Sequence, residues 1–359
     1  MSRTRASLTA IATLMGGTAI ADVPNVAVDI APVHSLVARV MEDVGTPDLI
    51  LPPGASPHEY SLRPSEATAL QDADIVVWMG EDLAPWMEDA VATLATNASV
   101  MTLLEEEETT LLEFRENALF EAHDHEDHAD HDEHAEDEHD HDDHADHDDH
   151  AEDEHDHAEA AAHEDHDDHD HEEHAHDEHD DDDHAGHDHG AHDPHAWLSP
   201  TNAATWLNLI AAELSAVDPD NAGTYFANAA AAGTEIEALS TEVTEILAPV
   251  RGQSFVVFHD AYQYFETDFD FPASGAISLS DATDPSPARI AEVQARIRDQ
   301  GITCVLSEPQ FNEGLVTTVL DGTEAKTAVI DPLGVDLEPG PTLYPQLIRN
   351  MATALAGCL

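Results

Sequence analysis

The chain has 359 residues and a formal net charge of −66, with 77 acidic side chains against 11 basic ones. This charge excludes nucleic acid and anionic membrane surfaces as partners, because both select for Lys and Arg. No segment is apolar over the roughly 20 residues that a membrane-spanning helix requires. The composition therefore predicts an acidic protein without a direct membrane anchor, and we take a monomer as the default.

The first residues have the features of a secretory signal peptide. Arg3 and Arg5 give a positive start, a mostly apolar stretch runs from Leu8 to Ile20, and small residues up to Ala21 form a cleavage site. We expect residues 1–21 to be removed after Ala21 and the mature protein to work in the periplasm. The residue directly after the cleavage site is Asp22 and not a cysteine, which argues against a lipid anchor.

The two cysteines of the chain, Cys304 and Cys358, stand in what should be an oxidising compartment. Such a pair predicts a disulfide more readily than a metal site or a catalytic thiol, with two free thiols as the alternative. A disulfide that closes the 54-residue separation between them contributes on the order of 4 kcal/mol to the free energy of unfolding in the chain-entropy model, less any strain.

One segment, from Glu121 to Asp193, holds 36 of the 77 acidic residues and 23 of the 27 histidines. It has almost no apolar residue larger than Ala, so it cannot bury enough surface to offset its ordering entropy. We therefore expect a disordered His/Asp/Glu-rich insertion over residues 121–191. Its imidazoles and carboxylates predict weak binding of several metal ions, with a merely solvated acidic loop as the alternative.

The part before the insertion alternates short apolar runs with helical patterns. We expect strands at 26–30, 49–51 and 75–79, a helix through 36–41 and another at 65–72. Strands that alternate with helices indicate a parallel sheet with crossover helices.

The part after the insertion repeats this pattern behind a long helix. The helical stretch from 219 to 249 would extend about 45 Å, which is the length of a domain rather than of a crossover. It is suited to joining an N-terminal α/β lobe (22–218) to a C-terminal α/β lobe (251–359), as a linking helix over 219–250. The other elements that we expect are helices at 200–217, 287–300 and 343–355 and strands at 254–258, 304–306 and 328–330.

Four histidines lie outside the segment 121–193: His34, His58, His195 and His259. His58 lies just past one predicted strand, and His259 and Asp331 directly follow two others. Ligands of open parallel sheets bind at the carboxyl ends of the strands, so these positions suit a binding site. Three imidazoles with a carboxylate or water make a four-coordinate zinc site. From position alone, the alternative for His58 is an ordinary loop histidine, and His195 could be the last member of the histidine-rich tract.

The sequence around three of these histidines is specific: LPPGASPHEYSLRPS at 51–65, HDPHAWLSP at 192–200 and FHDAYQYF at 258–265. These stretches resemble the metal-ligand motifs of periplasmic zinc-binding proteins that serve ABC-type uptake transporters. Residues 307–311 and 330–334 match two further landmarks of that family, in the same order. The resemblance covers the whole mature chain. It implies two α/β lobes bridged by a long helix, with the metal in the interlobe cleft and the insertion in the N-terminal lobe.

Carried over residue by residue, the resemblance implies His58, His195 and His259 as ligands of Zn²⁺. Manganese-binding relatives place a carboxylate where His259 stands, so an imidazole there favours zinc. The fourth ligand stays open between Asp331, water and a residue of the insertion, with Asp331 first. The alternative for Asp331 is to cap the turn that follows it or to orient a ligand. The cysteine pair resembles a disulfide of zinc-specific members, and His34 matches no ligand position.

Together these observations predict the zinc-capturing component of an ABC zinc-uptake system, which delivers Zn²⁺ to a permease at the inner membrane. The permease and its ATPase are implied by the resemblance alone. One alternative is a His-rich periplasmic zinc buffer or chaperone in which the insertion is the functional part. Another is a zinc hydrolase, because three histidines and an open position also describe a catalytic site. We find no His-Glu-x-x-His helix or other compact catalytic signature, and we expect no enzyme.

Overall fold

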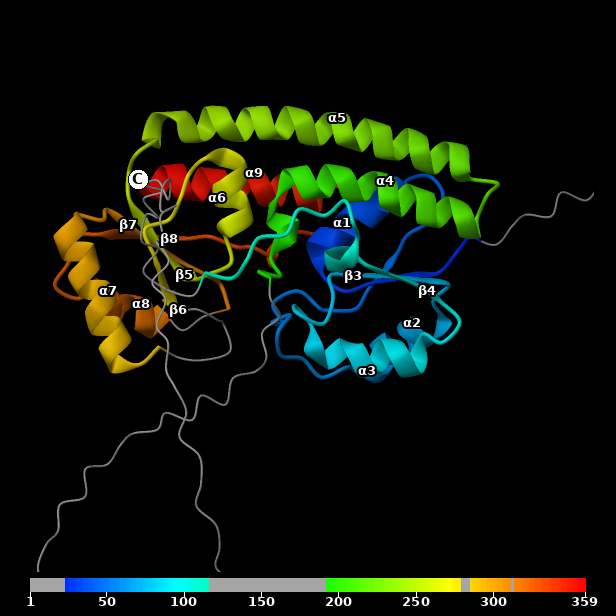
Figure 1. Ribbon diagram of the computed structural model, residues 1–359, viewed down its shortest axis with the longest axis horizontal. Coiled ribbons are helices and arrows are strands. Elements are labelled where there is room, and N and C mark those ends of the chain that lie inside the picture. Colours follow the sequence, from blue (N-terminus) through cyan, green and yellow to red (C-terminus); the bar gives the residue numbers. More distant parts are fainter. Residues whose placement is uncertain (1–22, 116–191, 279–284, 311–312) are drawn as a thin grey trace, which may run out of the picture. The chain divides into compact units, whose positions relative to one another are not determined.

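The computed structural model describes residues 23–115, 192–278, 285–310 and 313–359, which belong to one compact unit of the chain (Figure 1). The signal peptide expected at 1–21 and the insertion expected at 121–191 lie outside the described residues. No helix in the described part of the chain is long and apolar enough to cross a membrane.

The N-terminal lobe is built on a four-stranded parallel sheet with the strand order β2-β1-β3-β4. Alternate residues of β1 pack into different clusters: Val26 and Val28 face one cluster with helix α1, while Ala27 faces another with α2 and α3. Helices therefore cover both faces, which explains why β1 and β3 are buried throughout. The elements are β1 (Val26–Val28), α1 (Ala31–Val40), β2 (Asp48–Leu49), α2 (Pro64–Asp72), β3 (Ile75–Trp78), α3 (Pro85–Leu94), β4 (Ser99–Thr102) and the 3-10 turn η1 (Leu103–Glu105).

The C-terminal lobe repeats this plan with the strand order β6-β5-β7-β8, again parallel. Val256 and Val305 pack against α7 and α8 on one face, while Val257 and Leu306 join the cluster that includes α9 on the other. The elements are β5 (Phe255–His259), α6 (Gln263–Phe269), β6 (Ala276–Ser278), α7 (Pro287–Gln300), β7 (Cys304–Ser307), α8 (Glu313–Leu320), β8 (Lys326–Val329) and α9 (Leu343–Cys358).

Helix α5 (Ala222–Leu247) joins the two lobes (Figure 1). It packs against α4 (Pro200–Val217), against α1 of the N-terminal lobe and against α9 of the C-terminal lobe. Two ion pairs add to this packing, from Arg39 of α1 to Glu235 and from Arg349 of α9 to Glu242. The fold expected from the sequence, two parallel α/β lobes with one long linking helix, is confirmed. The remaining elements are the 3-10 turns η2 (Ala196–Leu198) and η3 (Ala248–Val250).

The linking helix begins later than the sequence pattern suggests, at Ala222 rather than at residue 219. The carboxylate of Asp218 accepts hydrogen bonds from the Asn221 side chain at 2.7 Å and from the Tyr225 hydroxyl at 2.8 Å. These contacts stabilise a turn between α4 and α5, so the residues after Asp218 serve the turn and not the helix.

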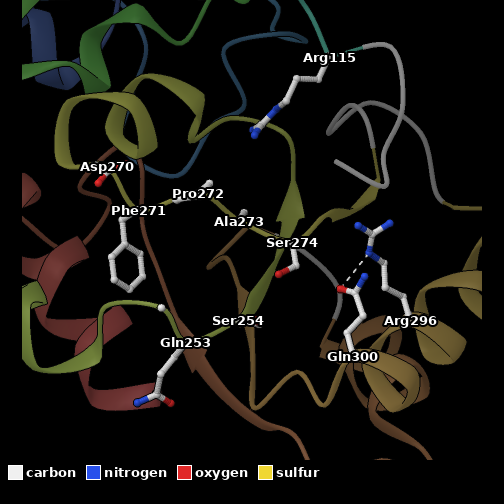
Figure 2. A pocket seen from close by; sticks show the side chains of 11 residues that line it. Arg115, Gln253, Ser254, Asp270, Phe271, Pro272, Ala273, Ser274, Arg296 and Gln300 are labelled. Carbon is white, nitrogen blue, oxygen red and sulfur yellow. Dashed lines mark hydrogen bonds between the residues drawn. The ribbon is translucent and has the colours of Figure 1, made fainter. Parts of the chain in front are cut away.

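A cavity of about 490 Å³ lies on the C-terminal lobe (Figure 2). It is lined by residues 252–254 and 270–274 and by two side chains of α7, Arg296 and Gln300, of which the first donates a 3.3 Å hydrogen bond to the second. Arg115 enters from a separate segment of the chain.

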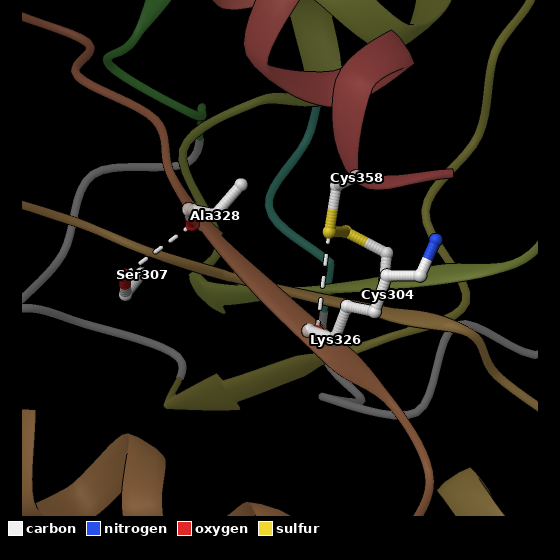
Figure 3. Close-up of a disulfide and its surroundings, with 5 residues drawn as sticks. All are labelled: Cys304, Ser307, Lys326, Ala328 and Cys358. Carbon is white, nitrogen blue, oxygen red and sulfur yellow. Dashed lines mark hydrogen bonds between the residues drawn. A yellow bond between two sulfur atoms is a disulfide. The ribbon is translucent and has the colours of Figure 1, made fainter.

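The expected disulfide is present between Cys304 and Cys358, whose Cα atoms are 5.6 Å apart (Figure 3). It ties the first residue of β7 to the last residue of α9. Both cysteines are buried, so the bond lies within the core that α9 forms on the sheet.

Candidate metal centre

Three histidines from three separate segments meet between the lobes. His58 lies in the loop between β2 and α2, His195 directly precedes η2, and His259 is the last residue of β5. One nitrogen atom of each imidazole lies within 4.8 Å of those of the other two. A tetrahedral zinc ion, with Zn–N bonds of about 2.0–2.1 Å, holds its ligand atoms about 3.4 Å apart. Small side-chain movements would therefore bring the three nitrogens onto one ion.

The middle ring of this group is that of His195. Its centroid lies 5.4 Å from that of His58 and 5.3 Å from that of His259. His195 and His259 are only 5% and 4% exposed, whereas His58 is half-buried. The group is therefore closed on the side of His195 and His259, and water reaches it from the side of His58.

The loop that carries His58 is fixed by a contact with α3. The indole Nε1 of Trp86 donates a 2.6 Å hydrogen bond to the carbonyl oxygen of Pro57. The backbone N–H of His58 donates to the Ser56 hydroxyl at 3.2 Å. Gly54 has φ +85°, a conformation that favours glycine and turns the chain after β2. These contacts hold His58 in place although no regular element contains it.

His195 and His259 are each oriented by a buried carboxylate. The Nδ1–H of His195 donates to Asp193 Oδ1 at 2.7 Å, and that of His259 donates to Glu308 Oε1 at 2.7 Å. Both carboxylates are buried. Donation from Nδ1 fixes the tautomer in which Nε2 carries the lone pair, and raises the basicity of that nitrogen as a ligand.

The electrostatics of the group depend on burial. Burial raises the pKa of Asp193 to about 7, although its hydrogen bond with the backbone of His195 and the charge of Arg115 act in the opposite direction. A nearby positive charge lowers the pKa of a buried carboxyl group. A divalent ion at the histidines would therefore favour the ionised form of Asp193. The Asp193–His195 pair is thus suited to a bound cation.

Asp331, the sequence-based candidate for a fourth ligand, lies outside this group. Its Oδ1 atom accepts the backbone N–H groups of Leu333 and Gly334 at 3.0 and 2.9 Å, and its Oδ2 atom accepts that of Val335 at 2.6 Å. Both oxygens therefore cap the turn after β8. Among the described residues, His58, His195 and His259 form the group of three or more potential ligand side chains whose donor atoms lie within 4.8 Å of one another.

His34 also lies apart from the group, as its sequence context suggests. It is buried in α1, and its Nε2 atom lies 3.1 Å from the carbonyl oxygen of Pro47. This contact connects α1 to the segment before β2, which makes His34 a structural residue.

Sequence reasoning did not assign roles to Asp193, Glu308 and Trp86. Asp193 stands at the edge of the acidic insertion, where composition groups it with dozens of solvated carboxylates. Glu308 lies within a family landmark, but its contact with His259 spans 49 positions in the chain. A signal existed for Asp193 alone, because an acidic residue two positions before a ligand histidine is able to reach its ring.

Comparison with known proteins places the chain in a family. The sequence profile described as "Zinc-uptake complex component A periplasmic" matches residues 26–358. The high-affinity zinc uptake system protein ZnuA of Brucella abortus (strain 2308) is 41% identical over 335 residues, or 93% of this chain and 91% of that protein. The protein of the same description from Paracoccus denitrificans is 41% identical over 340 residues, or 94% of this chain and 93% of that protein.

The fold has the same kind of relatives among solved structures. The crystal structure of a ZnuA deletion mutant with zinc bound superposes with a TM-score of 0.65 at 21% identity, covering 94% of this chain and 98% of that one. At this identity the match concerns the fold, which agrees with the two lobes and linking helix described above. The profile that spans residues 26–358, together with relatives of 41% identity, shows that the chain belongs to the ZnuA family of periplasmic zinc-uptake components.

Proposed function

We propose that the protein captures one Zn²⁺ ion between its lobes through His58, His195 and His259, and delivers it to the permease of an ABC transporter at the inner membrane. The observation that carries this proposal is the meeting of three imidazole nitrogens from three distant segments within 4.8 Å. Membership of the ZnuA family supports zinc as the cargo and uptake as the process.

The donor set favours zinc over harder cations. Three imidazoles suit Zn²⁺, whereas Mn²⁺ and Mg²⁺ prefer oxygen ligands. The carboxylates of Asp193 and Glu308 supply negative charge next to the ion through the histidines, without binding it. Cu²⁺ has at least equal intrinsic affinity for nitrogen ligands, so selectivity against copper rests on geometry and availability.

For the fourth position we propose water. Both oxygens of Asp331 accept backbone N–H groups, and withdrawing either from the turn would leave donors without acceptors. Asp331 stays the protein-derived alternative, followed by a residue of the insertion. An open fourth position also allows a cargo ion to exchange its last ligand on release.

The experiment that tests the ligand set is a zinc titration by calorimetry against a competing chelator. The mature protein without Glu121–His189 is compared with the same protein carrying His259→Ala, and His34→Ala serves as the histidine control. We expect one tight site that survives the deletion and His34→Ala but is lost with His259→Ala. No tight site in the shortened protein would overturn the three-histidine assignment or make the insertion part of the site.

The same deletion separates capture from buffering. If the protein worked as a periplasmic zinc buffer, removal of the histidine-rich segment would abolish its zinc binding, whereas a capture protein keeps one tight site. We also propose that the protein is not an enzyme, and assays of ester and peptide hydrolysis by the zinc-loaded protein test this. N-terminal sequencing of the exported protein tests cleavage after Ala21, and light scattering tests the monomer.

A further inference from the structure

The two chain segments on either side of residues 116–191 are joined to each other. Glu113 and His192 form an antiparallel bridge, and the backbone N–H of Asp193 donates to the carbonyl oxygen of Leu112 at 2.9 Å. We call residues 112–115 and 192–193 the stem. Because Asp193 holds the ring of His195, the stem carries one of the three histidines of the candidate metal centre.

The stem is fastened to α6 of the C-terminal lobe. The buried Tyr264 hydroxyl donates to the carbonyl oxygen of Asp193 at 2.8 Å and accepts the backbone N–H of Leu112 at 3.0 Å. The side-chain amide of Gln263 is oriented so that its NH₂ group faces two acceptors of the stem. In this orientation it donates to the Glu113 carbonyl oxygen at 3.1 Å and to Asp193 Oδ2 at 3.2 Å. Both segments of the stem thus contact the same helix.

Arg115 extends this contact to the end of β5. Its guanidinium pairs with both carboxylate oxygens of Asp260, the residue directly after His259, with Nε 3.0 Å from Oδ2. It also pairs with both oxygens of Glu266 on α6, at 2.8 and 3.2 Å. Asp260 and Glu266 are almost fully buried, and Arg115 is 18% exposed. Such bidentate pairing between a guanidinium and a carboxylate fixes the relative orientation of the two groups as well as their distance.

We propose that Arg115 is a positioning residue for the proposed zinc site, and that the stem sets the spacing between His195 and His259. The inference rests on the proposed function of the three histidines. His195 is tied to the stem through Asp193, and His259 through Asp260 and Arg115, so the stem connects both ligands. Without the guanidinium, two buried carboxylates lose their cation, which is strongly unfavourable. The segment at Asp260 then relaxes, and the ring of His259 moves with it.

The test measures zinc affinity in the full mature chain, with a chelator that competes strongly enough to report only the tightest site. Arg115→Met removes the guanidinium; the side chain lines the cavity of about 490 Å³, so the substitution does not overpack (Figure 2). We expect zinc to bind about tenfold more weakly, which is the lower end of the range for partners of ligands. Arg115→Lys keeps the positive charge but cannot form the bidentate pairs of a guanidinium, and it should give an intermediate zinc affinity.

The matched control is Arg39→Met. Arg39 is 16% exposed, pairs with two carboxylates, and lies on α1 against α5 rather than at the histidines. It should lower stability and leave zinc affinity unchanged. The visible spectrum of the Co²⁺-loaded protein, which reports ligand geometry, should change with Arg115→Met and not with Arg39→Met.

Several results would overturn the inference. Parent-like zinc affinity in Arg115→Met, or an equal loss in Arg39→Met, would show that Arg115 has no positioning role. If Arg115→Met does not fold, Asp260→Asn replaces it, because this change removes the charge that Arg115 holds beside His259; unchanged affinity there would count equally against the inference. If His259→Ala in the otherwise unchanged protein keeps the tight site, the proposed ligand set is refuted. Failure of the ligand set is thereby distinguished from failure of the positioning role of Arg115.

Discussion

The carboxylate partner of His259 differs from that of His195 in where it comes from. Asp193 is two residues from its histidine, so local geometry alone brings the two together. Glu308 follows the neighbouring strand β7, and its contact with His259 depends on the pairing of β5 with β7. The orientation of His259 therefore reports on the packing of the C-terminal sheet.

Glu308→Gln should weaken zinc binding by about 10- to 100-fold, the usual cost of removing the partner of a ligating histidine. Glutamine keeps the shape but loses the charge that raises the basicity of the imidazole. Competition titration of the shortened protein measures the effect, with Glu242→Gln on α5 as the control. Equal affinities in Glu308→Gln and the parent would mean that His259 needs no orienting carboxylate.

Asp331→Ala separates a turn cap from a metal ligand. The change removes the acceptors of three backbone N–H groups, so the free energy of unfolding should fall by about 1–3 kcal/mol. Zinc affinity should stay within about threefold of the parent, because we propose water in the fourth position. Denaturant unfolding and zinc titration measure the two quantities. A loss of affinity of a hundredfold or more with little loss of stability would instead make Asp331 the fourth ligand.

His34 gives the chain a pH-dependent stability that is separate from metal binding. Burial lowers the pKa of His34 below its ordinary value, and its Nδ1 atom is buried without a hydrogen-bond partner among the described residues. The folded state thus takes up the proton less readily than the unfolded state. Stability contributed by neutral His34 is present above the unfolded pKa of about 6.5 and is lost as the pH falls below it.

His34→Gln should therefore reduce the loss of stability between about pH 7 and 5, because glutamine is able to donate to Pro47 but does not titrate. Unfolding midpoints in urea at several pH values, with zinc removed by chelator, measure the slope. The same slope in the parent and the variant would show that other groups dominate the acid sensitivity.

At the scale of elements, the disulfide joins α9 to the C-terminal sheet beside β8, and the sulfur of Cys358 lies 3.9 Å from the Lys326 carbonyl oxygen (Figure 3). Helix α9 also packs on α5, so the bond secures a contact between the linking helix and the sheet. Its position at the start of β7 is at the opposite end of that strand from Glu308.

The double variant Cys304→Ser, Cys358→Ser should lower the free energy of unfolding by about 2–4 kcal/mol, through the larger entropy of the unfolded chain. Zinc affinity should not change, because the histidines and their partners lie elsewhere. Guanidinium unfolding and chelator competition test the two statements. A large loss of zinc affinity would show that the disulfide holds the site geometry and not only the fold.

Most of the regular structure follows from local sequence pattern. The linking helix is visible in the apolar spacing of Tyr225, Ala229, Ile236 and Leu239, all of which are buried in α5. The strands β6 and β4 are not, since β6 (AIS) has a single large apolar residue and two of the four residues of β4 are exposed. Such strands exist because a neighbouring strand is already in place, which no local pattern reports.

At the scale of the molecule, the candidate site was predictable through its motifs and not through its geometry. The three stretches around His58, His195 and His259 are recognisable, and the structure brings these residues together. The commitment of Asp331 to its own turn and the network from Arg115 to Asp260 depend on distances in the folded chain. No spacing in the sequence encodes them.

The placement of the proposed ligands predicts that zinc acts as a cross-link between lobes. His58 belongs to the N-terminal lobe and His259 to the C-terminal lobe, so an ion bound by both is bound only when the lobes are folded and in contact. Zinc at 100 times its dissociation constant should add about 2.7 kcal/mol to the free energy of unfolding. Thermal unfolding of the shortened protein, with and without zinc, measures this as a rise in the midpoint.

The two single variants make the argument specific. His58→Ala removes one of the two proposed ligands in the N-terminal lobe and leaves the other, His195, paired across the lobes with His259, with both carboxylates intact. If zinc stabilises by linking the lobes, His259→Ala should lose most of the rise in midpoint, because it removes the proposed histidine ligand of the C-terminal lobe. His58→Ala leaves one proposed ligand in each lobe and should lose only the part of the rise that the third ligand contributes. If His58→Ala keeps the full rise, the ion is held by His195 and His259 alone, and the half-buried loop of His58 serves the entry of zinc rather than its retention.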